Sequence, residues 1–202
     1  MLPRSFYTRH DVVEIARDLL GKVLVTRMNN LVTTAIITET EAYAGIADRA
    51  SHAFGGRRTV RTEIMYRIGG TAYIYLCYGV HSLFNVVTNK RDIPHAVLIR
   101  GIKPLEGIEI MEKRYRKKIL KNDVFHGPGK VTTLMGIHYS YTGLDLTIIP
   151  RREQKPGIWI EESLRPPLPS TVLTSSRVGV NYAGEDASLP YRFILKFNSE
   201  YL

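Results

Sequence analysis

Residues 35–52 constrain the fold of this chain more than any other stretch. The stretch begins with residues that favour β-structure, passes through two glutamates and is broken by Gly45. Side chains two positions apart share one face of a strand. One face therefore carries Ala35, Ile37, Glu39, Glu41 and Tyr43. Because this face begins apolar and ends in carboxylates and a tyrosine, it is typical of the floor of a cleft, and a short polar segment then leads to His52.

A purely structural interpretation of the same stretch stays open. Glu41 can be an edge carboxylate that pairs with one of the many arginines, Tyr43 a residue at the rim of the core, and His52 a surface histidine. Structural ion pairs are common in proteins. From this stretch alone the structural interpretation is favoured, so the rest of the chain has to decide.

Length and charge narrow the class of protein. The 202 residues fit a single domain, which we expect to span 1–202, with a substantial core. The 28 Lys and Arg against 19 Asp and Glu give a net charge of +9, which indicates a polyanionic partner, most commonly nucleic acid. Cys77 is the one cysteine, which excludes an internal disulfide and a cysteine-based metal cluster. Without an apolar run of membrane-spanning length or a signal-peptide core, we expect an intracellular, soluble protein.

The pattern along the chain predicts a β-rich protein with few helices. A capping box at 8–11 predicts a helix that ends at Gly21, and Asn29-Asn30 a tight turn between strands 22–28 and 31–41. Further helices are expected over 62–67, from Pro104 onward and up to Ile137. Further strands are expected over 71–78, 80–88, 95–100, 144–149, 158–161, 172–178 and 192–197. Pro166, Pro167 and Pro169 indicate a loop within one domain.

The antiparallel pair 71–78 and 80–88 gathers several aromatic side chains. Tyr73 and Tyr75 share a face with Cys77, although aromatic residues on strands usually belong to a core. Tyr78 precedes Gly79 at the turn and should project from the hairpin tip. Asn85 in the middle of a strand is unusual, because a buried amide needs hydrogen-bond partners.

Basic residues concentrate in loops and at element ends. Gly55-Gly56 lead into Arg57, Arg58 and Arg61, and Gly127-Pro128-Gly129-Lys130 opens a helix. Both arrangements suit phosphate oxygens, although a solvated basic loop explains the first equally well. Arg100 ends an apolar strand, either as a rim residue or as a ligand contact. The basic segment 113–121 is interpreted as a solvated surface.

Together these features suit an enzyme that acts on a nucleotide turned out of a duplex. Aromatic faces stack on bases and arginines hold phosphates. A projecting side chain can fill the gap that the displaced nucleotide leaves. A carboxylate can then orient and deprotonate a water.

The sequence resembles the alkyladenine (3-methyladenine) DNA glycosylase family, the mammalian-type enzyme and its bacterial relatives. The matching segments follow one another from Glu39 to Glu185: ETEAYAG, ASH, GGRRTVR, TAYIYLCYGV, FNVV, VLIRGIKPLEG, GPGK and SRVGVNYAGE. The set as a whole is highly specific, although each piece is weak. The resemblance implies an α+β fold, a single mixed domain with a curved antiparallel sheet, partly open and barrel-like, and flanking helices.

The resemblance also implies a role for each matched residue. Glu41 matches the general base, Tyr78 the wedge inserted into the duplex, and Asn85 the residue that obstructs the 2-amino group of guanine. The pocket that stacks on the flipped base is matched by Tyr43, His52 and Tyr75. Contacts with the DNA backbone are matched by Arg57, Arg61, Met65, Arg100 and Lys130, with Arg100 near the flipped nucleotide's phosphate.

The implied reaction is base excision from double-stranded DNA by a monomer that needs neither a metal nor another cofactor. Substrates would be 3-methyladenine-type purines, with hypoxanthine and ethenoadenine as further candidates. No lysine aligns with a Schiff-base nucleophile, so simple hydrolysis to an abasic site is expected. Two alternatives stay open: a non-catalytic nucleic-acid-binding domain, and a sugar hydrolase that uses Glu39 and Glu41 as a carboxylate pair.

Overall fold

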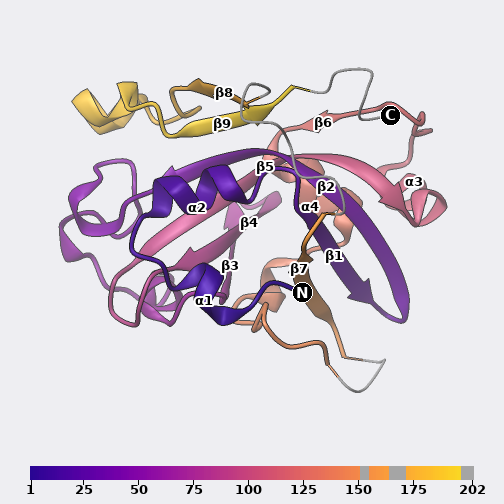
Figure 1. The fold of residues 1–202 in the computed structure, drawn as a ribbon, viewed down its shortest axis with the longest axis horizontal. Coiled ribbons are helices and arrows are strands. Elements are labelled where there is room, and N and C mark those ends of the chain that lie inside the picture. Colours follow the sequence, from indigo (N-terminus) through magenta and orange to yellow (C-terminus); the bar gives the residue numbers. More distant parts are fainter. Residues whose placement is uncertain (151–154, 164–171, 197–202) are drawn as a thin grey trace.

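One curled antiparallel sheet organises the chain (Figure 1). The computed structural model describes residues 1–150, 155–163 and 172–196. Within them, strands pair in the order β3-β4-β5-β2-β1-β7, while β6 pairs with β5, and β9 with β2 and β8. The strands are β1 (Val23–Met28), β2 (Leu31–Tyr43), β3 (Ala72–Cys77), β4 (His81–Thr88), β5 (His95–Glu106), β6 (Phe125–His126), β7 (Gly157–Glu161), β8 (Val172–Ser175) and β9 (Arg192–Leu195). This half-barrel confirms the expected α+β fold with a curved sheet.

Four short α-helices flank the sheet in the described part of the chain. They are α1 (Arg4–Tyr7), α2 (Val12–Asp18), α3 (Ile108–Tyr115) and α4 (Pro128–Met135). Asp11 caps α2 by accepting hydrogen bonds from the backbone N–H groups of Val13 and Glu14, so the helix begins with this residue and not with the expected box at Thr8. No helix in the described ranges has the length and apolar character needed to cross a membrane.

One expected helix start and one expected strand are wrong, although the helix itself is present as α3 from Ile108. Pro104 does not open a helix but lies in β5, next to a register shift between Thr34 and Ala35 of β2. A proline is tolerated there because an irregular pairing does not need its missing N–H. The expected strand 144–149 is a turn region whose only described pairing is the isolated bridge from Asp145 to Thr71. The predicted loop at 166–169 lies outside the described residues.

The core lies between the sheet and its helices. Its largest fully buried side chains include Phe84, Phe193, Ile37 and Ile99, from four different strands. A smaller apolar cluster, which includes Met65, joins the loop before β3 to the other side of the sheet. The curled sheet therefore has apolar packing on both faces, and residues of the smaller cluster also line the cavity described below.

A bulge in β2 shapes the part of the sheet where that strand turns polar. The pairing of β2 with β5 shifts register on both sides of Glu39. Opposite it lies Gly101, where a Cβ atom would come within 2.7 Å of the Glu39 Cβ and the Thr38 Oγ1. Only glycine allows this approach. Bulges re-aim side chains beside functional sites, and here the two glutamates of β2 are brought towards the same neighbours.

Candidate active site

A cavity of about 200 Å³ opens where β2, β3, β4 and β5 come together. Its lining includes five residues that the sequence assigned to base recognition or to the wedge, together with Arg100 from the end of the apolar segment of β5. These five residues are Tyr43, His52, Tyr75, Asn85 and Tyr78. The fold therefore brings together side chains that are far apart in the sequence.

Glu41 lies fully buried beneath this cavity. Its Oε2 accepts a hydrogen bond of 2.8 Å from the Tyr43 hydroxyl, and its Oε1 one of 2.8 Å from the Val178 backbone N–H. The Arg100 Nε lies 3.4 Å from the same Oε1. These three partners line the cavity, whereas Glu41 itself has no exposed surface.

The environment of Glu41 makes it more basic than an ordinary glutamate. Burial raises its pKa, against the opposing effects of the Arg100 charge and of the hydrogen bonds from Val178 and Tyr43. Burial also raises the pKa of Tyr43 well above its usual value, so this phenol stays a hydrogen-bond donor to the carboxylate. A carboxylate with a raised pKa at the base of a cavity is suited to accept a proton.

The other β2 carboxylate, Glu39, is held by ion pairs. Its Oε1 lies 2.9 Å from the Arg100 Nε and 2.7 Å from the Arg192 Nε, and its Oε2 lies 2.9 Å from the His126 Nδ1. Burial alone would raise the pKa of Glu39, but the hydrogen bonds from His126 and Arg100 and the two arginine charges hold it below its usual value. The two glutamates therefore differ in basicity although they share Arg100.

One wall of the cavity is aromatic. The Tyr75 ring lies 4.8 Å from the His52 ring and 5.4 Å from the Tyr73 ring, measured between centroids. The His52 Nδ1 is 2.8 Å from the Tyr73 hydroxyl, and the Arg61 guanidinium lies 4.6 Å from the Tyr75 ring centroid. Burial, assisted by the charges of Arg61 and Arg57, lowers the pKa of His52 to about 4. An uncharged histidine in an aromatic wall is compatible with a cationic ligand.

Asn85 on β4 is fixed at the opposite side of the hairpin. The side chain is 4% exposed, and its amide donates hydrogen bonds of 3.1 Å to the Tyr73 carbonyl and 3.4 Å to the Leu83 carbonyl. The unusual amide in mid-strand thus finds its donor partners in the backbone of β3 and β4. It presents a fixed polar surface to the cavity.

Tyr78 projects from the hairpin tip, as the sequence predicts. Its side chain is 98% exposed, and both Tyr78 and Gly79 have positive φ angles, of 49° and 72°. Two central residues with positive φ are typical of a type I′ turn, whose twist suits a hairpin. For a bulky aromatic residue this conformation is unusual. The turn therefore holds a large apolar ring in solvent beside the cavity.

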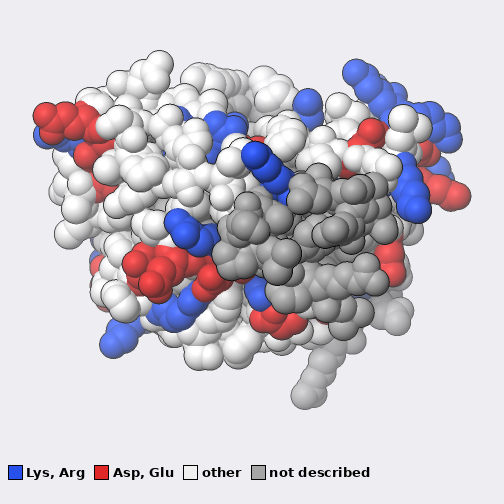
Figure 2. Space-filling model, turned by 45° about the horizontal axis from the view of Figure 1, so that its top comes forward, with Lys and Arg blue, Asp and Glu red and all other residues white. Residues whose placement is uncertain are grey.

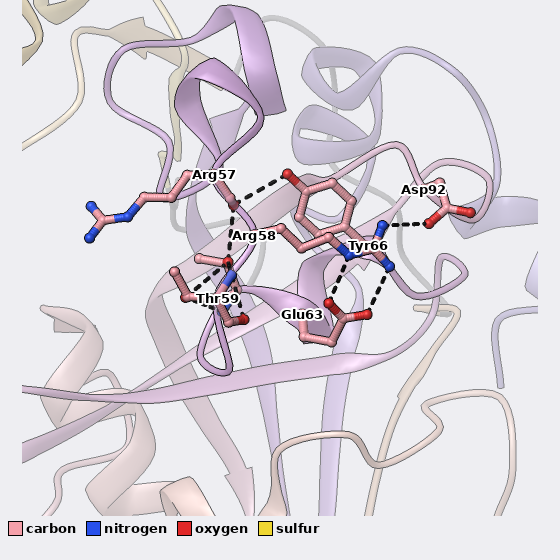
Figure 3. A network of polar contacts seen from close by, with 7 residues as sticks. Arg57, Arg58, Thr59, Glu63, Tyr66 and Asp92 are labelled. Carbon is pink, nitrogen blue, oxygen red and sulfur yellow. Dashed lines mark hydrogen bonds and ion pairs between the residues drawn. The ribbon is translucent and has the colours of Figure 1, made fainter.

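The arginines of the 54–61 loop fall into two groups (Figure 3). Arg58 pairs with Glu63 and Asp92 and lies over the Tyr66 ring, 4.5 Å from its centroid. The Arg57 side chain extends away from this network, while its backbone carbonyl accepts a hydrogen bond from the Tyr66 hydroxyl. The expectation of phosphate contacts from all three arginines of this loop thus has less support for Arg58, whose charge is already balanced.

A second cavity, of about 350 Å³, lies next to the first and is basic. Arg49, Arg57 and Arg61 line it, together with His52 and Tyr182, which the two cavities share. In the described part of the chain none of these three arginines makes an ion pair with a carboxylate. This groove offers uncompensated positive charge beside the base cavity.

The remaining residues assigned to DNA contacts lie in different settings. Lys130 is exposed in the first turn of α4, where Pro128 lines the base cavity. Met65 is 2% exposed and lines the same cavity from within, so its side chain offers no surface to a DNA backbone in this conformation. Arg100 is held by Glu39 and Glu41.

The surface charge is unevenly spread. Figure 2 shows a group of basic side chains, with acidic side chains among them, at the end of this face where α3 lies, and further basic and acidic side chains at the opposite end. In the 113–121 segment, Arg114 is partly buried: it donates to the Leu134 carbonyl and to the Thr33 hydroxyl, so it ties α3 to α4 and β2. The other basic residues of the segment are mostly exposed, in line with a solvated surface.

Sequence patterns missed one group beneath the cavity. Arg177 is 5% exposed, pairs with Asp48, donates 2.9 Å to the Ala42 carbonyl and lies 4.9 Å from the Tyr43 ring centroid. The Arg177–Asp48 ion pair thus packs against the Tyr43 ring. Tyr182, which lines the cavity, was also missed; its hydroxyl donates to the Ala50 carbonyl. Both residues lie in the SRVGVNYAGE segment, which was quoted only for its resemblance.

An aromatic cavity over a basic carboxylate, bordered by unpaired arginines, is suited to an enzyme that acts on the bases of a nucleic acid. Comparison with known proteins agrees. The methylpurine-DNA glycosylase family matches residues 5–199. The chain is 44% identical over 196 residues to a Chlamydia abortus protein named "Putative 3-methyladenine DNA glycosylase", covering 96% of this chain and 98% of the other. Proteins of that name from Clostridium novyi and Desulfitobacterium hafniense are each 39% identical over 208 residues, covering 100% of this chain and 97% of theirs.

The chain therefore belongs to the methylpurine-DNA glycosylase family. It is an enzyme, a DNA glycosylase that hydrolyses N-glycosyl bonds in the repair of alkylated bases. This identification rules out a non-catalytic nucleic-acid-binding domain as the whole function.

Proposed function

We propose that this protein turns 3-methyladenine-type purines out of duplex DNA into the cavity and hydrolyses the N-glycosidic bond with a water activated by Glu41. The product is an abasic site, the first intermediate of base excision repair. One observation carries the proposal: a buried carboxylate with a raised pKa lies directly beneath an aromatic cavity.

The cavity suits the chemistry of alkylated purines. A purine such as 3-methyladenine is cationic as the nucleoside, and aromatic faces attract cations. Tyr43, His52 and Tyr75 supply such faces, and His52 is uncharged because its pKa is lowered to about 4. Asn85 obstructs a 2-amino group in this proposal and so excludes guanine; its fixed position, held by backbone carbonyls, supports that role. Hypoxanthine and ethenoadenine fit the same proposal as further substrates.

Glu41 has two tasks in the reaction. The bond breaks through a state with oxocarbenium character, which a nearby negative charge stabilises. The same carboxylate accepts a proton from the attacking water. Its oxygens already accept bonds from Tyr43 and Val178, but each carboxylate oxygen can accept more than one hydrogen bond, so a water can share one of them.

DNA binding rests on the surface around the cavity. Tyr78 acts as the wedge that fills the space of the extruded nucleotide. Arg57 and Arg61, which make no ion pair with a carboxylate among the described residues, and Lys130 on α4 contact phosphates on either side. Arg100 lies near the phosphate of the flipped nucleotide. In this proposal the protein acts as a monomer in the cytoplasm, at the nucleoid.

Two alternative mechanisms have less support. A sugar hydrolase would need Glu39 and Glu41 to flank a bond, but both carboxylates meet at Arg100, and Glu39 is also engaged by Arg192 and His126. A Schiff-base mechanism with strand cleavage would need a lysine at the site. No lysine lines the cavity in the ranges that the structure describes.

The test is base release from methylated duplex DNA. Free 3-methyladenine should appear by chromatography, and the DNA strand should stay intact until alkali cleaves it at the abasic site. Borohydride should trap no covalent complex. A panel of duplexes with 3-methyladenine, hypoxanthine, ethenoadenine or undamaged guanine ranks the substrates. Absence of release from every damaged duplex would refute the proposed function.

A further inference from the structure

Glu39 is a second buried carboxylate that the reaction does not use directly. It is 1% exposed, and three strands converge on it: β5 supplies Arg100, β9 supplies Arg192 and β6 supplies His126. The bulge in β2 and the missing side chain of Gly101 create the room for this convergence. Burying a carboxylate is unfavourable unless it is well paired, and here every side of the group is occupied.

Arg100 is shared unequally between the two glutamates. Its Nε lies 2.9 Å from the Glu39 Oε1 but 3.4 Å from the Glu41 Oε1. Arg192, which lies opposite Glu41 in the β2–β9 register, also directs its Nε to Glu39, at 2.7 Å. Both arginines thus make their shortest carboxylate contact with the neighbour of Glu41. If they turned to Glu41, it would be a poorer proton acceptor.

We propose that Glu39 is a positioning residue for the reaction: it pairs with Arg192 and takes the shorter contact with Arg100, which weakens the pairing of Arg100 with Glu41 and so keeps Glu41 a competent base. This inference rests on the proposed function and deepens it. Glu39 also contributes its own negative charge, which disfavours a second negative charge nearby and so favours the protonated form of Glu41. The shared arginine therefore couples the charge state of Glu41 to a residue that touches no substrate.

Other charged and titratable groups face the pair and stay unchanged in the test. Towards Glu41 these are Tyr43 on its own strand, and Arg177 and Tyr182 from the segment after β8. Towards Glu39 the additional group is His126 on β6, whose side chain is 56% exposed. A change made only at Glu39 or Arg192 therefore reports the coupling.

Two variants should shift the titration of Glu41 in opposite directions. Glu39→Gln removes a negative charge and frees both arginines. The pH at the midpoint of the Glu41 titration should therefore fall by about one unit. Arg192→Gln removes a positive charge and leaves Arg100 to Glu39 alone, so the midpoint should rise by a similar amount. A loosened structure would admit water and move both midpoints the same way, towards that of an ordinary glutamate.

The direct measurement is a carboxyl ¹³C NMR titration of the free protein, with the Glu41 signal assigned by its loss in Glu41→Gln. It needs no substrate, so it separates this inference from the proposed function. Shifts of opposite sign support the inference, and an unchanged or same-signed shift in the two variants overturns it. Should Glu39→Gln fail to fold, an Arg192→Gln midpoint that does not rise overturns it as well.

The pH profile of single-turnover excision is the second readout. The acid limb should move with the NMR midpoint in each variant, and the plateau rate of Glu39→Gln should fall by about three- to tenfold, because a weaker base transfers the proton less effectively. A merely structural role would lower thermal stability without moving the limb, and that result would overturn the inference. Wild-type protein that releases no base would refute the proposed function instead.

Discussion

Replacing Glu41 with glutamine changes the charge of the site with the smallest change of shape. The amide oxygen can keep the hydrogen bond from the Val178 N–H and face the Arg100 guanidinium. The amide nitrogen then faces the Tyr43 hydroxyl, which can rotate its proton and accept. The neighbours therefore need not move, and the variant isolates the loss of charge and basicity.

The expected loss of rate follows from the two tasks of the carboxylate. A general base contributes about 100- to 10,000-fold. Loss of the negative charge beside an oxocarbenium-like state adds to this, and burial of Glu41 keeps that interaction strong. Together we expect single-turnover excision to fall by at least about 1,000-fold, which corresponds to about 4 kcal/mol of transition-state stabilisation.

The same variant should be at least as stable as the parent. Burial raises the pKa of Glu41, so the folded protein holds this proton more tightly than the unfolded chain does. The resulting stabilisation is complete below the ordinary glutamate pKa and is lost as the pH rises through the raised value. At neutral pH the ionised Glu41 therefore lowers the free energy of unfolding. Glutamine stays neutral, so the melting temperature of Glu41→Gln should not fall and should rise most at neutral pH.

The assay compares parent and variant on one lesion duplex. Single-turnover excision, affinity for lesion DNA and thermal unfolding at several pH values are measured together. The expected pattern is lost excision, retained affinity through Tyr43, His52 and Tyr75, and unchanged or higher stability. Excision by Glu41→Gln at a near-parental rate would refute the assignment of the base. Lost excision with lost stability would show that the carboxylate is structural.

Three further predictions concern the DNA-binding surface. Tyr78→Ala should reduce excision from duplex DNA much more than excision from single strands. The reason is that the wedge offsets the unstacking of the base, which costs about a few kcal/mol. Equal losses on both substrates would contradict the wedge role. Asn85→Ser should increase release of guanine or 3-methylguanine, since a shorter side chain leaves room for the 2-amino group; unchanged release would remove the steric role. Arg57→Ala and Lys130→Ala should each reduce by about one unit the slope of log affinity for duplex DNA against log salt concentration. The matched control is Arg58→Ala, which should leave the slope unchanged because Arg58 is already paired with Glu63.

Local sequence patterns predicted the strands and hairpins whose form depends on alternating side chains and on turn residues. The hairpin of β3 and β4 has its tip at Tyr78 and Gly79 as expected, because alternating side chains and a turn dipeptide determine it locally. The shared face of Tyr73, Tyr75 and Cys77 followed from the same alternation and is seen in the lining of the cavity. Strand alternation also placed Glu39 and Glu41 near each other, although the bulge between them was not foreseen.

Long-range contacts could not be predicted in this way. Nothing local to Arg177 indicates that it contacts Ala42 and Tyr43. Nothing local to Arg192 indicates that it pairs with Glu39, since β9 pairs with β2 across 150 residues of chain or more. The sequence likewise does not show that Arg58 pairs with Glu63 and Asp92, and this pairing distinguishes it from Arg57 and Arg61. Pro104 shows the converse error, where a residue typical of a helix start is tolerated in a strand because the pairing is irregular there.

The hairpin that carries Tyr78 also has a consequence for how this protein can evolve. Tyr75 precedes the turn by three positions and Asn85 follows on the return strand, so two pocket residues and the wedge share one continuous ladder. Any substitution in it alters one side chain at a time. A single inserted or deleted residue would turn the pocket residues of that strand to the opposite face. We therefore expect descendants of this gene to keep the length of the hairpin even where single side chains outside the pocket and the wedge change.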